Sequence, residues 1–180
     1  LAMFDWYNLT GNQDAFDVGS KLTAYLRDFQ PLWQNPDTVR FPNEGSGQFQ
    51  GHIHSYLQVA HAYLAEAEAR RKTNPQDSIA QDDINRAKEM YNFVKRRTKG
   101  DILGNFGVMD NVDDMIRIGL KLEDLHAEST FDEIERWTRN QLVEGQIDPF
   151  TGQNYIPNFV TNDYATDNVG SKVTGLWFSD

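Results

Sequence analysis

Residues 100–120 read GDILGNFGVMDNVDDMIRIGL, and this stretch decides the fold class because a glycine-spaced loop leads directly into an amphipathic helix. Asp110 or Asn111 can cap this helix, and the acidic residues that follow suit the positive end of a helix dipole. Apolar residues recur at helical spacing further on, at Val112, Met115, Ile116, Gly119 and Leu122. The loop and the helix are therefore predicted to form one unit.

The same construction occurs once earlier, where a loop rich in Gly and Gln precedes a helix that opens with His52 and His54. Around these two units, apolar periodicity and helix-ending residues predict six helices. The predicted helices cover residues 2–9, 14–30, 52–72, 80–97, 110–125 and 131–144. An apolar face is expected in the second, third and fourth of them. Its residues are Phe16, Leu22, Tyr25, Leu26 and Phe29 in the second helix, Ile53, Tyr56, Leu57, Ala60, Tyr63, Leu64 and Ala67 in the third, and Ile84, Ala87, Met90, Tyr91 and Val94 in the fourth.

Residues 1–146 are thus expected to form three helical hairpins, which repeat with a period of roughly 50 to 58 residues. Links within hairpins are short, whereas those between hairpins are long and contain Gly and Pro, so the long links should share one face. The predicted fold class is all-α, with repeated helical hairpins forming part of an (α/α)6 toroid or an open solenoid. Residues 147–180 are expected to be irregular, with a strand at 173–178, and to lead into a further part of a longer protein.

Composition excludes several classes of function. The net charge of −10 leaves no surplus of Lys and Arg to neutralise phosphates, so we expect no nucleic-acid partner. No apolar run has the length of a membrane span. The absence of Cys excludes disulfides, thiolate nucleophiles and Cys-ligated zinc. The triplet Asn8-Leu9-Thr10 fits an N-glycosylation site and would suit a secreted, extracellular protein.

The segment 113–146, DDMIRIGLKLEDLHAESTFDEIERWTRNQLVEGQ, resembles part of the β-L-arabinofuranosidase-like, six-hairpin glycosidase superfamily. The segments 6–22 and 51–64 resemble earlier hairpins of that group, in its uncharacterised members above all. The resemblance implies an (α/α)6 barrel that acts on glycans and is secreted. The best-known members use a zinc-linked cysteine nucleophile with glutamates. This chain has Val108-Met109-Asp110 at the corresponding place, so that mechanism is not carried over.

Four residues are candidates for catalysis. Asp110 and Asp114 are four residues apart and share a helix face, and glycoside hydrolysis uses two carboxyl groups across the scissile bond. His52 and His54 can serve as general base or acid, or bind sugar hydroxyls. They point the same way if residues 50–54 are extended, and to different faces if the helix has begun. The alternative interpretation is that the acids stabilise the helix start and the histidines are structural.

Aromatic and amide side chains in the loops are candidates for substrate binding, because aromatic rings stack on sugars and amides orient a ligand. These residues are Gln48, Phe49, Gln50, Phe106, Asn111 and Tyr155. Trp6 and Trp137 are expected in helix cores. The spacing of the histidines is not that of an HExxH zinc site, so we expect no metal and no cofactor.

We therefore expect a carbohydrate-active protein, a glycoside hydrolase whose site lies on the face of the long links and whose partner is a polysaccharide or other glycan. Three alternatives remain open. One is a polysaccharide lyase on the same fold, with a histidine as base. The others are a glycan-binding protein without catalysis and a helical-repeat scaffold that binds another protein. The sequence does not define the sugar, the linkage or the oligomeric state.

Overall fold

The computed structural model describes residues 1–28, 53–97 and 109–142, and within these ranges every regular element is a helix. In chain order they are α1 (Ala2–Thr10), α2 (Gln13–Asp28), α3 (Ile53–Thr73), α4 (Ser78–Arg97), α5 (Met109–Asp124), α6 (Phe131–Trp137) and a π-helical turn at Thr138–Leu142. The all-α prediction is confirmed for this part of the chain, while the expected irregular segment 147–180 lies outside it. None of the described helices is long and apolar enough to cross a membrane.

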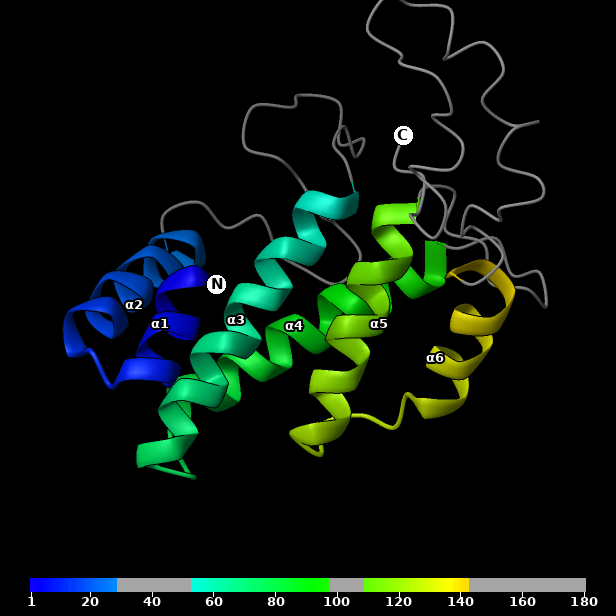
Figure 1. Cartoon of the computed structure of the whole chain (residues 1–180). Coiled ribbons are helices and arrows are strands. Elements are labelled where there is room, and N and C mark those ends of the chain that lie inside the picture. Colours follow the sequence, from blue (N-terminus) through cyan, green and yellow to red (C-terminus); the bar gives the residue numbers. More distant parts are fainter. Residues whose placement is uncertain (29–52, 98–108, 143–180) are drawn as a thin grey trace, which may run out of the picture.

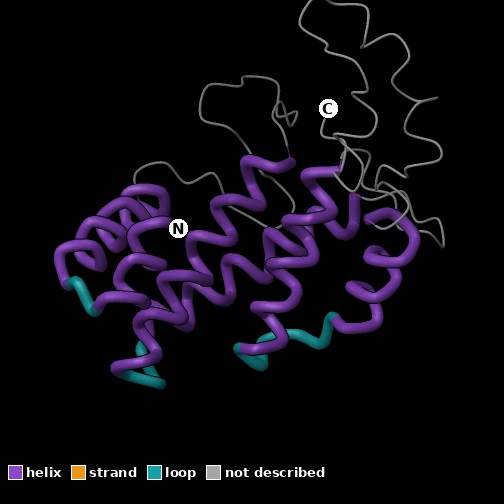
Figure 2. Tube along the Cα trace, in the orientation of Figure 1, coloured by secondary structure: helices purple, strands orange, loops and turns teal. Residues whose placement is uncertain are grey.

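Consecutive helices form pairs, and the three pairs lie side by side. The turns that join α1 to α2, α3 to α4 and α5 to α6 all lie toward the same side of the molecule, as Figure 2 shows. The first turns of α3 and α5 lie on the opposite side (Figure 1). Contacts run from α1 to α3 and from α3 to α5, so the odd-numbered helices make one layer.

Helix α3 is the centre of this arrangement, because α1, α2, α4 and α5 all pack against it. The apolar face predicted from the sequence is buried at Leu57, Ala60, Tyr63, Leu64 and Ala67. Burial extends beyond that face to Ala65, Glu66 and Ala69, which lie against the first hairpin or between helices. Its small side chains let four neighbouring helices approach the same segment.

Helices α4 and α5 complete the main core. The predicted stripe of α4 is fully or almost fully buried at Ile84, Ala87, Met90, Tyr91 and Val94. On α5, Val112, Met115 and Leu122 are buried as predicted, Ile116 is partly buried, and Ile118 is a core residue that the stripe did not include. Trp137 from α6 closes this core and makes an edge contact with the ring of Tyr91, so its predicted place in a helix core is confirmed.

Helix ends follow the chemistry of their capping residues. Gly11 adopts a left-handed φ of 71° and its N–H donates to the carbonyl of Tyr7, which ends α1. The side chain of Asn12 caps α2 and that of Asp77 caps α4. Helix α5 begins at Met109, so Asp110 and Asn111 lie inside its first turn, and the prediction that one of them caps the helix is wrong.

The apolar face predicted for α2 is wrong at Leu22 and Tyr25, whereas Phe16 and Leu26 are half-buried and Phe29 lies outside the described residues. The buried residues of α2 are Ala15, Gly19 and Thr23, whereas Leu22 and Tyr25 have exposed fractions of 58% and 49%. Trp6 on α1, expected in a core, is also exposed. The physical reason is that the ring of Phe4 lies on Gly19, so α1 and α2 approach through small residues and leave the larger ones outside.

Substitution of Gly19 by Ala should destabilise the protein. The added Cβ would lie 2.8 Å from Cζ of the buried Phe4 ring. We expect this overpacking to lower the free energy of unfolding by about 1–3 kcal/mol, which outweighs the better helix propensity of Ala, worth about 1 kcal/mol. Urea denaturation followed by circular dichroism measures the change. In a Phe4→Leu background the cost of Gly19→Ala should shrink, and an unchanged cost would show that the contact is not its cause.

Candidate functional site

Helices α3 and α5 are parallel neighbours, and one hydrogen bond defines their register. Nε2 of Gln58 donates to Oδ1 of Asp114 over 2.7 Å, and the two residues are 56 apart in the sequence. The helices themselves begin 56 residues apart, at Ile53 and Met109. Equivalent positions on the two helices are therefore related by the same spacing, and both helices start at the same end (Figure 1).

Three of the predicted site residues lie in the first turns of these helices. His54 is the second residue of α3, and Asp110 and Asn111 are the second and third residues of α5. His54 and Asp110 are again 56 residues apart, and each lies four residues, about one helical turn, before Gln58 or Asp114. The backbone thus places His54 and Asp110 at equivalent positions on adjacent helices. Their side chains lie outside the described part of the structure.

Asp114 is the predicted site residue whose side chain the structure describes. It is 3% exposed and accepts the hydrogen bond from Gln58. Asp113, its neighbour, is partly exposed and pairs with Arg117 one turn later at 3.0 Å. The first turn of α5 therefore leads to one acid that faces α3 and one that pairs with Arg117 at the surface.

The remaining candidates cannot be placed relative to these helices. Residues 29–52, 98–108 and 143–180 are outside the described ranges, and they contain His52, Gln48, Phe49, Gln50, Phe106 and Tyr155. Of the predicted site, the structure therefore describes only the first turns of α3 and α5. We call the end of the molecule formed by residues 53–58 and 109–114 the helix-start end.

A buried histidine lies one turn below the helix-start end. His61 has its pKa lowered, first by burial and then by the charges of Lys121 and Arg117. The lowered pKa favours the neutral imidazole at neutral pH. Lys121 also pairs with Glu68 at 2.7 Å, so α3 and α5 are joined by an ion pair as well as by the bond between Gln58 and Asp114.

The structure contains a buried ion cluster that sequence reasoning missed. Glu66 on α3 and Asp83 on α4 are both fully buried, and Arg27 from α2 pairs with both of them. Arg70 adds a second cation, with NH2 2.6 Å from Oε1 of Glu66. The hydroxyl of Thr23 also donates to Glu66. We call these five residues the ion cluster, and it joins α2, α3 and α4.

The two carboxyl groups of the ion cluster differ in their surroundings. Burial, and then the charge of Glu66, raise the pKa of Asp83 to about 7, and Arg27 only partly opposes this shift. Oδ1 of Asp83 accepts from Arg27, but Oδ2 is buried with no hydrogen-bond partner in the described part of the chain. An oxygen without a partner makes the charged form costly, which explains the direction of the shift.

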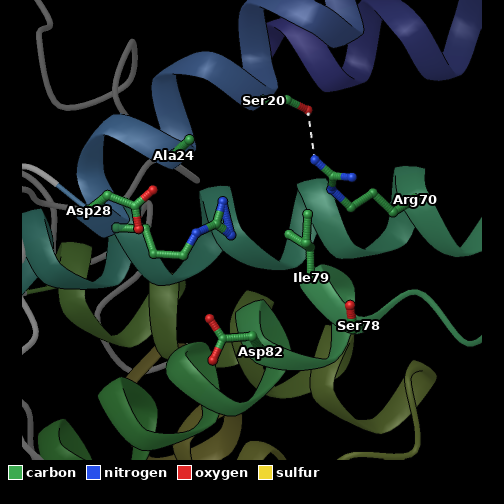
Figure 3. A pocket seen from close by; sticks show the side chains of 8 residues that line it. Ser20, Ala24, Asp28, Arg70, Ser78, Ile79 and Asp82 are labelled. Carbon is green, nitrogen blue, oxygen red and sulfur yellow. Dashed lines mark hydrogen bonds between the residues drawn. The ribbon is translucent and has the colours of Figure 1, made fainter.

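A cavity of about 350 Å³ with a mixed polar and apolar wall lies beside the ion cluster, between α2, α4 and the end of α3 (Figure 3). Its wall carries cations and acids together, from Arg27, Arg70, Asp28 and Asp82, with Ser20 within 3.5 Å of Arg70. Both arginines are already paired with buried acids. No group of three or more His, Asp or Glu suited to a metal occurs among the described residues. We interpret the cluster as a structural connection between helices.

One signal in the sequence indicates the ion cluster in retrospect. Glu66 lies between the core residues Ala65 and Ala67, and Asp83 directly precedes the core residue Ile84. Arg27 and Asp83 are 56 residues apart, the spacing that also relates Gln58 to Asp114. A charged residue on a predicted buried face indicates a buried ion pair when a residue of opposite charge lies one repeat length away in the sequence.

Removal of Arg27 should destabilise the fold strongly. In an Arg27→Met variant at pH 8, above the pKa of about 7 of Asp83, Glu66 keeps Arg70 but the ionised Asp83 loses its cation, and breaking a buried pair in this way costs about 3–5 kcal/mol. Arg86→Met is the matched control, because Arg86 pairs with the exposed Asp82 and such surface pairs contribute about 0–1 kcal/mol. Chemical denaturation measures both. Equal losses in the two variants would contradict the assigned role of Arg27.

The raised pKa of Asp83 predicts a specific pH dependence of stability. The folded state keeps this proton up to about pH 7, whereas the unfolded chain releases it near the ordinary value of 3.8. Between these values the unfolded state binds fewer protons, so Asp83 lowers the free energy of unfolding as pH rises. From pH 5 to pH 7, the unfolding free energy of the wild type should therefore fall relative to that of Asp83→Asn. Above pH 7 the difference between the two proteins should become constant. Asp82→Asn should show no such trend, and a flat difference for Asp83→Asn would refute the assignment.

Comparisons of the chain with models of protein families, with curated proteins and with solved structures find no match in any of the three. The resemblance to six-hairpin glycosidases therefore depends on the motif residues alone. A function for this chain has to be argued from the helix-start end and its register.

Proposed function

We propose that this protein is carbohydrate-active, a glycoside hydrolase whose site is built at the helix-start end. The observation that carries the proposal is the register of α3 and α5, which brings His54 and Asp110 to equivalent positions on adjacent parallel helices. Both residues belong to the set that the sequence singled out for catalysis. Their positions at one end of two neighbouring helices are what a shared site requires.

The hydrogen bond between Gln58 and Asp114 lies one helical turn after His54 and Asp110 and holds the two helices together there. Because Asp114 is buried and paired, it is suited to hold the two helices in register and not to contact a sugar. Asp110, one turn nearer the helix start, is the acid for which we propose proton transfer to the leaving group. Asn111 in the same turn is proposed to orient the substrate, together with Gln48, Phe49, Gln50, Phe106 and Tyr155 from the adjoining segments.

The arrangement of hairpins supports the toroid as the proposed complete fold. All described turns within hairpins lie on one side, and the starts of α3 and α5 lie on the other. In a closed ring of such hairpins, every long link would fall on the face that carries the helix-start end. A glycan laid across that face would contact several links at once, and this is the shape we propose for the substrate site.

A polysaccharide lyase on the same fold is the second candidate. The observation that favours it is that the residue of α3 at the position equivalent to Asp110 is a histidine, His54, and not a second acid. A lyase needs a base that removes a proton next to a uronate carboxyl, and a histidine of ordinary pKa can do this near neutral pH. Hydrolysis and elimination differ in their products, so one assay distinguishes them.

Incubation of the protein with plant and microbial polysaccharides should release shorter sugars, detected by mass spectrometry. We expect Asp110→Asn and His54→Ala to lower the rate by at least about 100-fold, the usual contribution of a general acid or base. Asp113→Asn is the matched control, since it removes the same charge from the same turn at a partly exposed position, and its rate should stay within about twofold of wild type.

The mass of the products decides between the two reactions, because hydrolysis adds water and elimination leaves an unsaturated uronate. If Asp110→Asn and Asp113→Asn lose equal activity, Asp110 is not the acid that transfers the proton. If a folded wild-type protein binds a glycan by calorimetry but releases no product, the protein is a glycan-binding protein and the proposed hydrolase activity is wrong.

A further inference from the structure

The first hairpin, formed by α1 and α2, lies outside the main hydrophobic core. The described residues of that core come from α3, α4, α5 and α6, and none of them belongs to α1 or α2. The hairpin has a smaller apolar cluster, in which Phe4 lies with Ala65 and Ala69 of α3, and Tyr7 and Phe16 pack beside them. Figure 1 shows the hairpin at the end of the helical array opposite α6. It therefore joins the other described helices through a separate contact.

The contact of α2 with its neighbours has unfilled space along two faces of the helix. The cavity of about 350 Å³ beside the ion cluster adjoins the face that carries Ser20, Ala24 and Arg27 (Figure 3). A second cavity, of about 320 Å³, lies between α1, α2 and α3 and adjoins the face that carries Gly19 and Leu22. Side chains beside a void lose the dispersion contacts that a packed core supplies. Packing therefore gives α2 a weaker attachment than the helices of the main core have.

Charged side chains make further connections between the first hairpin and the other helices. Arg27 pairs with Glu66 of α3 and with Asp83 of α4. Arg70 of α3 pairs with Glu66 and lies over the ring of Phe16, with 5.4 Å between its guanidinium carbon and the ring centroid. Among these connections, the pair of Arg27 with Asp83 is the one that reaches α4. The ion cluster therefore contributes much of what holds α2 in place.

The proton of Asp83 changes the balance of charge in the ion cluster. The charged and titratable groups that act on this buried carboxyl are Arg27 from α2 and Glu66 and Tyr63 from α3. Asp82 acts on it from its own helix. Without its proton, Asp83 is a fully buried charge near the like charge of Glu66, and its Oδ2 has no hydrogen-bond partner among the described residues. Loss of the proton therefore makes the contact of α2 with α3 and α4 less favourable.

We propose that the first hairpin is a detachable element, held on the other helices by the ion cluster and released when Asp83 loses its proton. In the closed state α2 lies on α3 and α4, as in the structure. In the open state α1 and α2 separate from α3, while α3, α4, α5 and α6 keep the main core. Asp83 then reaches water, which stabilises its charged form, so opening and proton release favour each other. The proposal does not depend on the proposed enzymatic activity.

Thiol labelling measures the opening, because the chain has no Cys of its own. Ala69→Cys places a thiol on α3 under the first hairpin, and Ala87→Cys is the matched control in the main core, since both alanines are fully buried. Each rate is divided by that of the same variant denatured in urea at the same pH, because thiol reactivity itself rises with pH. At pH 7, Ala69→Cys should react at least about tenfold faster than Ala87→Cys, since local opening precedes global unfolding. Equal rates would show one cooperative unit and overturn the proposal.

The same labelling from pH 5 to pH 8 tests the role of Asp83. In the closed state burial raises its pKa to about 7, so the corrected rate of Ala69→Cys should rise by about tenfold or more from pH 5 to pH 7 and level off above. Addition of Asp83→Asn should remove this rise, whereas Asp82→Asn, which changes the neighbouring acid, should keep it. A rise that persists with Asp83→Asn, or a flat rate without it, would overturn the proposal.

Hydrogen exchange of the unsubstituted chain gives a second measurement that does not depend on a variant folding. At pH 7 the protection of residues 2–10 and 13–28 should be at least about tenfold lower than that of residues 57–67 and 84–94, because the first hairpin opens without the main core. Low concentrations of urea should leave exchange in the first hairpin almost unchanged, since a local opening exposes little surface. Equal protection in the two sets of residues would contradict a detachable hairpin.

Discussion

The carboxylate of Glu66 has to be neutralised inside the helix layers, and this requirement determines how α2 sits on α3. An ionised carboxylate buried without a partner costs several kcal/mol, about the order of a domain's whole stability. Arg27 and Arg70 supply the compensating charge, one from each helix. Helix α2 buries only small side chains, so apolar contact alone gives it a weak hold. The position of α2 therefore depends on the pairs of Arg27 with Glu66 and Asp83 as well as on apolar contact.

One spacing of 56 residues relates contacts in different parts of the molecule. It separates Gln58 from Asp114 in the layer of α3 and α5, and Arg27 from Asp83 between α2 and α4. The starts of α3 and α5 show the same separation. A repeated hairpin that is displaced as a unit brings residues at this spacing together wherever neighbouring repeats touch. The helix-start end follows from this rule, because it places the first turns of successive hairpins beside each other.

Periodicity predicted the helices and the core of α3, α4 and α5, where large apolar residues mark the buried face. It failed at Leu22 and Tyr25 of α2, because the fully buried positions of that helix are Ala15, Gly19 and Thr23, and a search for large apolar residues does not select them. It also missed Glu66 and Asp83, since charged residues in a helix are ordinarily assigned to solvent. For the candidate site, the sequence selected Asp110 and His54 separately. Their common register depends on which helices are neighbours, and that is a property of the tertiary fold.

Thr23 links the packing of the first hairpin to the ion cluster. It is buried on α2 and its hydroxyl donates to Glu66, while Gly19, one turn earlier on the same helix, lies against the ring of Phe4. When Asp83 loses its proton, the buried cluster becomes more costly and the folded position of α2 is weakened. Protonation of Asp83 therefore favours the folded position of α2, and with it the contact between α1 and α2 at Gly19.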